Sequence, residues 1–311
     1  MIKGDREGFD SDRFKADLGY RFMDMPPYFP AISGPDNIRQ LDRFAGHIES
    51  AGCDAMMVSA YDIHHAGGRD GMGPVIDRLN KRKILFMDSG GYEAQGRDDW
   101  DFDKYRRVLE WVRPSIYASY DVVHKEYGID ICDQTLEYMR RSLKICPDSS
   151  CAVVCHGDSV DQLIEVVSAV ASCHPGRPAI MAVPDRECGR LVREKMVAVK
   201  RIKDTMDLLN DHARLHILGC DDPVSGALLE IVGADSVDGT GWYKRTNMDA
   251  ILKSLTGGWW RQDARRKVNL RGNVLDYMNT FGLLRAVTAR DGSKTAGSGG
   301  WRLRHGRRTF R

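Results

Sequence analysis

The residues of this sequence best suited to chemistry are aspartates that follow short apolar runs. Asp88 follows ILFM, Asp121 follows IYASY and Asp238 follows ADSV, and three more stand in similar places: Asp158, Asp185 and Asp221. Carboxyl groups brought together in this way support a divalent-metal site, a glycosyl-transfer pair of nucleophile and acid/base, or recognition of an amidine-like edge of a base. The alternative for each aspartate is that it only caps the following helix.

The elements that must position these aspartates alternate regularly along the chain. Short apolar runs predict strands at residues 28–32, 55–61, 84–88, 116–121, 151–156, 179–183, 215–219 and 234–238. Helical periodicity predicts helices at residues 36–51, 103–112, 135–145, 160–172, 189–209 and 225–232. Eight strands alternating with helices predict an α/β fold, a (β/α)8 TIM barrel. Active sites of such barrels lie at the C-terminal ends of the strands, where these aspartates stand.

The chain divides into three expected parts. Its 311 residues exceed the roughly 250 that one barrel needs, so an appendage is expected. We predict an N-terminal segment at residues 1–25, a catalytic barrel at residues 26–256 and a basic C-terminal extension at residues 257–311. Within that extension, residues 291–300 are rich in Gly and Ser, as flexible linkers are.

A net charge of only +2 conceals the basic character of the C-terminal part. The residues that we assign to nucleic-acid binding are Lys244, Arg245, Arg261, Arg265, Arg266, Lys267 and Arg271. Such a segment suits a polyanion, because each neutralised phosphate releases counterions. The alternative is a solvated tail that only aids solubility.

Composition excludes several classes of protein. Hydrophobic residues make up 42% and charged residues 29%, and no apolar run approaches the roughly 20 residues of a membrane span. The polar N-terminus resembles neither a secretory nor a transit peptide, so we expect a cytoplasmic protein with no membrane partner. The eight cysteines lack the close pairs typical of zinc sites. We therefore expect reduced thiols and no bound metal.

Two stretches of the sequence carry a resemblance to a known family. Residues 88–92, DSGGY, resemble the DSGG(F/Y) signature of tRNA-guanine transglycosylases. Residues 223–238 resemble the family's segment from a proline through a helix to a G-x-D-x-x-D strand, whose last aspartate is the nucleophile; that position is Asp238. The similarity covers about residues 26–250.

Shorter matches extend the resemblance to the other strand ends. Tyr120 and Asp121 match the family's aromatic-Asp pair that holds the base, and His156 falls where the family usually has glutamine. Ala182 and Val183 match the core of the GGLAVGE loop, although its two glycines are replaced here.

The resemblance implies a catalytic role for two aspartates. Asp238 would attack C1′ of the target nucleotide and form a covalent glycosyl-enzyme as guanine leaves. Asp88 would handle the protons of the leaving and incoming bases, a task that suits a carboxyl whose pKa is raised by burial near another acid.

The resemblance also implies a set of base-binding residues: Ser89, Gly90, Tyr92, Asp121, His156, Ala182, Leu218 and Gly219. Asp121 would accept hydrogen bonds from N1 and the exocyclic amine of a guanine-like base. Tyr92 and Leu218 would stack on its two faces, or are simply core residues. His156 either donates to O6 of the base or is a satisfied structural residue.

One departure from the family changes the expected substrate. Classical members bind structural zinc through a CxCxxC motif and a histidine, whereas no cysteine follows Cys220 here. This resembles the branch that inserts 7-cyano-7-deazaguanine (preQ0) or a relative into DNA. We therefore expect exchange of guanine in DNA for a 7-deazaguanine, without a cofactor, on a base that is flipped out or single-stranded.

Other readings stay open. The chain could be a zinc-free tRNA-guanine transglycosylase that acts on tRNA, or a non-catalytic nucleic-acid-binding subunit of such an enzyme. A homodimer or a partner protein is also open, since enzymes of this family often dimerise. Retention of both Asp88 and Asp238 argues against the non-catalytic subunit.

Overall fold

Eight parallel strands close into a barrel in sequence order. The computed structural model of the protein describes residues 26–82, 84–95, 97–122, 130–174, 180–209 and 213–244. The strands are β1 (Tyr28–Ile32), β2 (Ala55–Ser59), β3 (Ile84–Asp88), β4 (Ile116–Ala118), β5 (Ser150–Val154), β6 (Ile180–Pro184), β7 (Arg214–Leu218) and β8 (Ser236–Gly239). The predicted (β/α)8 barrel is therefore confirmed.

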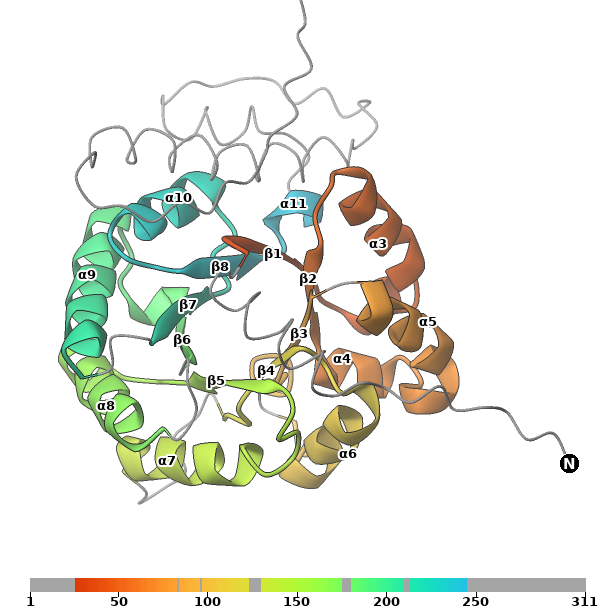
Figure 1. Cartoon of the computed structure of the whole chain (residues 1–311), viewed down its shortest axis with the longest axis horizontal. Helices are drawn as coiled ribbons and strands as arrows, with labels where there is room; N and C mark the ends of the chain where they lie inside the picture. The colour runs from red at the N-terminus through yellow and green to blue at the C-terminus, as the bar shows by residue number, and fades with distance from the viewer. Residues whose placement is uncertain are drawn as a thin grey trace, which may run out of the picture.

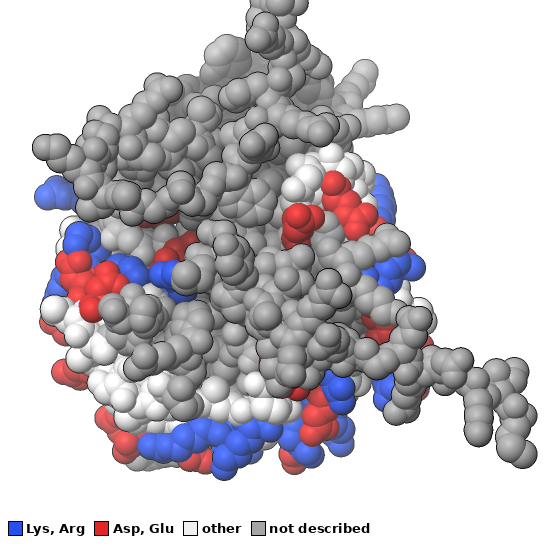
Figure 2. All heavy atoms as spheres, in the orientation of Figure 1, with Lys and Arg blue, Asp and Glu red and all other residues white. Residues whose placement is uncertain are grey.

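Helices form a ring around the strands of the barrel (Figure 1). They are α2 (Pro35–Ile38), α3 (Leu41–Ser50), α4 (Ala60–His65), α5 (Gly68–Arg82), α6 (Phe102–Val112), α7 (Ile131–Ser142), α8 (Val160–Cys173), α9 (Val192–Leu209), α10 (Pro223–Ile231) and α11 (Gly241–Lys244), with a short 3-10 helix, η1 (Asp185–Glu187), after β6. Figure 2 shows Lys and Arg side chains interspersed with Asp and Glu over this ring.

The parts predicted at residues 1–25 and 257–311 lie outside the described residues. So do the predicted nucleic-acid-binding residues Arg245, Arg261, Arg265, Arg266, Lys267 and Arg271, while Lys244 is the last residue of α11. Within the described ranges, no helix combines the length and apolar character needed to cross a bilayer. All eight cysteines are free of disulfide bonds.

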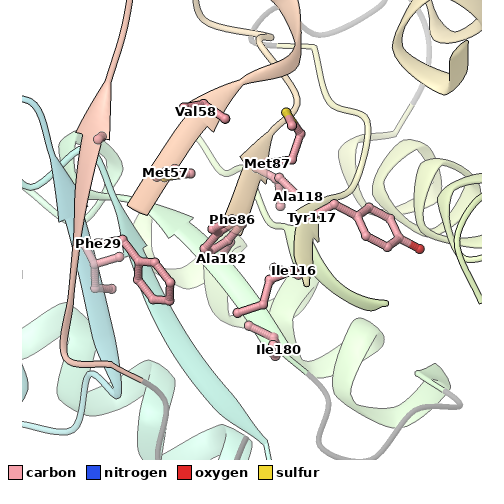
Figure 3. Packing of buried hydrophobic residues seen from close by; sticks show 14 of the residues in the cluster. Phe29, Met57, Val58, Phe86, Met87, Ile116, Tyr117, Ala118, Ile180 and Ala182 are labelled. Carbon is pink, nitrogen blue, oxygen red and sulfur yellow. The ribbon is translucent and has the colours of Figure 1, made fainter. Parts of the chain in front are cut away.

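Alternation along the strands separates an inner from an outer set of side chains. Phe29, Phe86 and Ile116 turn towards the barrel interior, whereas Tyr117 turns outwards (Figure 3) and donates a 3.0 Å hydrogen bond to the Ser142 carbonyl of α7. The rings of Phe29 and Phe86 pack edge to face with centroids 5.4 Å apart, and the His216 ring lies 4.8 Å from Phe86. Residues two positions further along the same strands, such as Asp88, therefore lie above this layer.

Several predicted boundaries were wrong for identifiable reasons. The second strand ends at Ser59 rather than residue 61, because the Ser59 hydroxyl accepts from the Asp62 amide and caps α4. The fourth ends at Ala118 rather than residue 121, since the Tyr120 amide donates to the Ser142 hydroxyl of α7. The helix predicted at residues 36–51 is two helices, α2 and α3. Helices α4 and α5 were not predicted.

Trp242 in α11, which follows the last strand, packs against the first strand β1 and helix α3. Its side chain is fully buried, and its indole N–H donates to the Ala31 carbonyl of β1 at 2.9 Å. The ring also packs edge-on against Phe44 of α3, with centroids 5.8 Å apart. The hydrogen bond to Ala31 and the packing of the indole ring together hold α11 against β1 and α3.

We expect Trp242→Ala to lower the free energy of unfolding by about 3–5 kcal/mol, because it leaves a large cavity and an unpaired carbonyl. Denaturation in urea measures the loss. Trp111→Ala is the matched control, since Trp111 of α6 is only partly buried and should cost less. Equal losses for the two variants would contradict this role of Trp242.

Candidate active site

A cavity of about 380 Å³ lies at the C-terminal ends of the strands. This volume falls within the range of pockets that hold a small organic ligand. Six carboxyl side chains line it: Asp88, Glu93, Asp121, Asp185, Asp221 and Asp238. They come from the ends of β3, β4, β6, β7 and β8, so barrel closure gathers groups that are far apart in the sequence.

Most of the predicted site residues meet in this cavity. Those that line it are Asp88, Ser89, Tyr92, Asp121, His156, Leu218, Gly219 and Asp238. Gly90 and Ala182 do not. Ala182 is fully buried within β6, where its carbonyl accepts from the Cys155 amide at 2.9 Å.

Asp238 is held by only one of its two carboxylate oxygens. Its Oδ1 accepts from the Gly219 amide at 2.9 Å and lies 3.2 Å from His216 Nε2. His216 is fully buried, and its Nδ1 lies 2.7 Å from the Ser236 hydroxyl, which fixes the ring. Within the described part of the chain, Asp238 Oδ2 forms no hydrogen bond. One oxygen is thus anchored, and the other is left to act on a ligand.

The two glycines after Asp88 make room for the groups beside them. Gly90 has φ +86°, and a Cβ there would lie 2.2 Å from Tyr61 Cβ. A Cβ on Gly91 would lie 2.8 Å from both carboxylate oxygens of Asp121. The turn therefore needs glycine twice, once for its backbone conformation and once for close approach to a carboxylate.

Asp121 and His156 belong to one hydrogen-bonded network. The Ser89 hydroxyl donates to Asp121 Oδ1, and His156 Nε2 lies 2.9 Å from Asp121 Oδ2. On the other side of the ring, Nδ1 lies 2.8 Å from Glu187 Oε1. Burial lowers the pKa of His156, but the bonds to Asp121 and Glu187 outweigh it and raise the pKa to about 10. His156 is therefore an imidazolium whose two N–H groups both serve carboxylates, and donation to O6 of a base would require it to leave Asp121.

Asp88 and Glu93 form a pair of acids with raised pKa values. Burial, reinforced by the charges of Glu93, Asp121 and Asp238, raises the pKa of Asp88 well above its ordinary value. Burial, together with the charge of Asp62, raises the pKa of Glu93 to about 7. Glu93 Oε1 accepts from the Ser33 hydroxyl at 3.1 Å, while its Oε2 is buried and has no hydrogen-bond partner among the described residues. Asp88 thus keeps its proton at pH values where an ordinary aspartic acid has lost it.

Sequence reasoning did not select His216, Glu93, Glu187 or Arg186, all of which belong to the site or contact it. His216 stands two residues before Leu218 in β7, so strand alternation would have placed both on the inner face. Glu93 directly follows Tyr92, and Glu187 follows Asp185 by two residues in the loop after β6. Nothing in the linear spacing links Glu187 to His156.

Within the residues that the structure describes, no three His, Cys, Asp or Glu side chains are grouped so that they could hold a metal ion. No protein-family model matches the chain, and no curated protein matches it either.

Replacing Glu93 by Gln should change the pH dependence of stability. A carboxyl whose pKa is raised from 4.5 to about 7 favours the folded state fully below pH 4.5 and loses that contribution as pH rises through 7. Relative to wild type, E93Q should therefore gain up to about 3 kcal/mol of unfolding free energy between pH 4.5 and 8.

Urea denaturation at a series of pH values measures this difference. Glu137→Gln is the control, because Glu137 is an exposed side chain of α7. A difference between E93Q and wild type that stays constant from pH 4.5 to 8 would show that Glu93 ionises normally.

Gly91→Ala should destabilise the protein by about 1–3 kcal/mol, because the added methyl group must push Asp121 out of its network. Gly46→Ala in α3 is the control, since a Cβ there meets nothing within 4 Å. Denaturant midpoints compare the two variants. Equal stability of both would mean that the Asp121 carboxylate moves aside freely.

Proposed function

We propose that this protein is a transglycosylase that exchanges guanine in DNA for a 7-deazaguanine base such as preQ0. The observation that carries the proposal is that Asp238, with one anchored and one unbonded oxygen, lines the same small cavity as Asp88, whose pKa is raised well above its ordinary value. A nucleophile and a proton donor side by side are what the exchange of a glycosidic bond requires.

The first half of the proposed reaction breaks the bond between the sugar and guanine. Asp238 Oδ2 attacks C1′ of the target nucleotide, the C1′–N9 bond breaks, and its electron pair goes to the leaving base. Asp88 supplies the proton that this base takes up. The Gly219 amide and His216 keep the carboxylate oriented towards the sugar by holding Oδ1.

The second half reverses these roles. Asp88, now a carboxylate among Glu93 and Asp121, removes the ring N–H proton of the incoming 7-deazaguanine, and the charges that raised its pKa make it a stronger base. The base then attacks C1′, and Asp238 leaves as a carboxylate. Asp88 ends protonated as it began, so the cycle needs no external proton and no cofactor.

Recognition of the base falls to Asp121. A carboxylate has about four acceptor positions, and Ser89 and His156 use one on each oxygen. The remaining positions can accept from N1 and the exocyclic amine, the edge that guanine and a 7-deazaguanine share. His156, whose pKa is raised to about 10, places a positive charge 2.9 Å from Asp121 Oδ2.

The choice of DNA over tRNA rests on the resemblance, because no cysteine follows Cys220 in this sequence, whereas the zinc module of the tRNA enzymes uses cysteine ligands. The proposal can be tested by incubating the protein with labelled preQ0 and either DNA or tRNA. Label in DNA is the expected result. Label in tRNA alone would replace DNA by tRNA as substrate, and label in neither would favour a non-catalytic subunit.

Asp238→Asn should abolish the covalent adduct with DNA and lower the exchange rate roughly a thousandfold or more, while base binding survives. Asp88→Asn should slow exchange by about 10²–10⁴-fold because proton transfer is lost. Denaturing gels detect the adduct, and label incorporation gives the rate. Asp204→Asn on the exposed side of α9 is the control. An adduct that persists in Asp238→Asn rules out Asp238 as the nucleophile.

A further inference from the structure

The cavity has room for one nucleoside-sized ligand but not for a nucleic-acid strand, since its volume is about 380 Å³. If the base and sugar of a target nucleotide occupy it, the phosphates on either side must remain at the rim. Six carboxyl groups line the same cavity, and the ionised ones repel a phosphate there. A polyanionic ligand therefore needs a cation at the rim.

Arg186 is the one Lys or Arg among the described residues that line the cavity. It lies in η1, directly after β6. Its guanidinium carbon lies 5.0 Å from the centre of the Tyr92 ring, and its side chain is 44% exposed. The ion pair that it forms with Glu187 is long, 3.9 Å, so the guanidinium keeps donor capacity for a ligand.

Tyr92 provides the support for this cation. Tyr92 is 64% exposed, unlike most large hydrophobic residues of the described barrel, and it also lines the cavity. A guanidinium over an aromatic face is attracted by the ring, while its N–H groups, which lie in its own plane, stay free to bind an anion. In the Arg186–Tyr92 pair the ring thus holds the guanidinium in place, while the N–H groups of Arg186 can still donate to an anion.

The backbone beneath Arg186 is held firmly. Glu187, the next residue, accepts from the Gly157 amide through Oε2 at 2.9 Å and contacts His156 through Oε1 at 2.8 Å. These bonds tie η1 to the loop after β5. The direction in which Arg186 leaves the backbone is therefore fixed relative to the cavity.

We propose that Arg186, supported by the ring of Tyr92, binds a phosphodiester group of the target strand at the rim of the cavity. The planar fork of a guanidinium matches two phosphate oxygens, and the contact places the target sugar over Asp238. This inference rests on the proposed function, since it takes a nucleotide within a strand to be the ligand.

Equilibrium binding of a fluorescent single-stranded DNA oligonucleotide containing guanine tests the inference without turnover. Wild type, Arg186→Gln and Arg186→Lys are compared over a series of salt concentrations. Arg186→Gln should weaken binding about tenfold at low salt and reduce the slope of log K against log salt by about 0.7, the value for one phosphate contact on a single strand. Arg186→Lys should restore most of the slope, because it keeps the charge.

Arg201→Gln is the matched control, because Arg201 on α9 is exposed, pairs with Asp161 at 2.8 Å and does not line the cavity. It should leave the slope unchanged. Affinity for free preQ0, measured by calorimetry, should stay the same in Arg186→Gln. A slope that is unaltered in Arg186→Gln, or altered equally in Arg201→Gln, would overturn the phosphate site.

These outcomes are separable from those of the proposed function. If the wild type exchanges bases but Arg186→Gln does not change the salt dependence of DNA binding, the phosphate site is refuted and the transglycosylase function stands. If the slope of log K against log salt depends on Arg186 but the protein exchanges no base, the phosphate site is supported and the transglycosylase function is refuted.

Discussion

Strand β8 pairs with β7 on one side and with β1 on the other, and this closure sets the position of Asp238 relative to the rest of the cavity. Phe29 lies opposite Asp238 in the β1–β8 pair, and Ile217 lies opposite Val237 in the β7–β8 pair. The second pairing brings His216 within reach of Asp238 Oδ1. Without closure, Asp88 and Asp238 would stand at separate positions along an open sheet.

Closure has an electrostatic consequence, because several acids then share a poorly solvated space. These acids differ in the groups that compensate for their burial. Asp121 has His156 and Ser89, Asp185 has Lys195, and Asp221 accepts from the backbone amide and the hydroxyl of Thr240. Burial raises the pKa values of Asp88 and Glu93, which favours their protonated forms. A carboxyl with a raised pKa is what acid–base chemistry on a base uses.

The barrel could be predicted from the sequence because its apolar runs and helical periods are regular, and two strands, β1 and β3, have the predicted bounds. Helix α5 could not, since its glycines and Pro74 argue against a helix. Tertiary packing overrides that local preference: Met72, Ile76 and Leu79 recur at helical spacing and are buried in the core. Only an interpretation that weighed this spacing above the glycines would have found the helix.

Site residues that belong to a sequence motif could be predicted, whereas those brought to the site only by folding could not. Asp88, Asp121 and Asp238 lie at or just beyond the C-terminal ends of strands, so their approach followed from the barrel. The bond between His156 and Glu187 joins loops 31 residues apart in the chain, and no pattern in the sequence relates them. The pKa of Glu93 is raised by burial and by the charge of Asp62, and both causes depend on how the chain packs.

The anchored carboxylate of Asp238 bears on the stereochemistry of the proposed reaction. Gly219 and His216 hold Oδ1, so the carboxylate stays on one side of the sugar through both halves of the reaction. Attack by Asp238 inverts the anomeric carbon, attack by the incoming base on the opposite face inverts it again, and the two inversions restore the original configuration. The new base would therefore stand on the same face of the sugar as the old one, in the β-orientation that a double helix accepts.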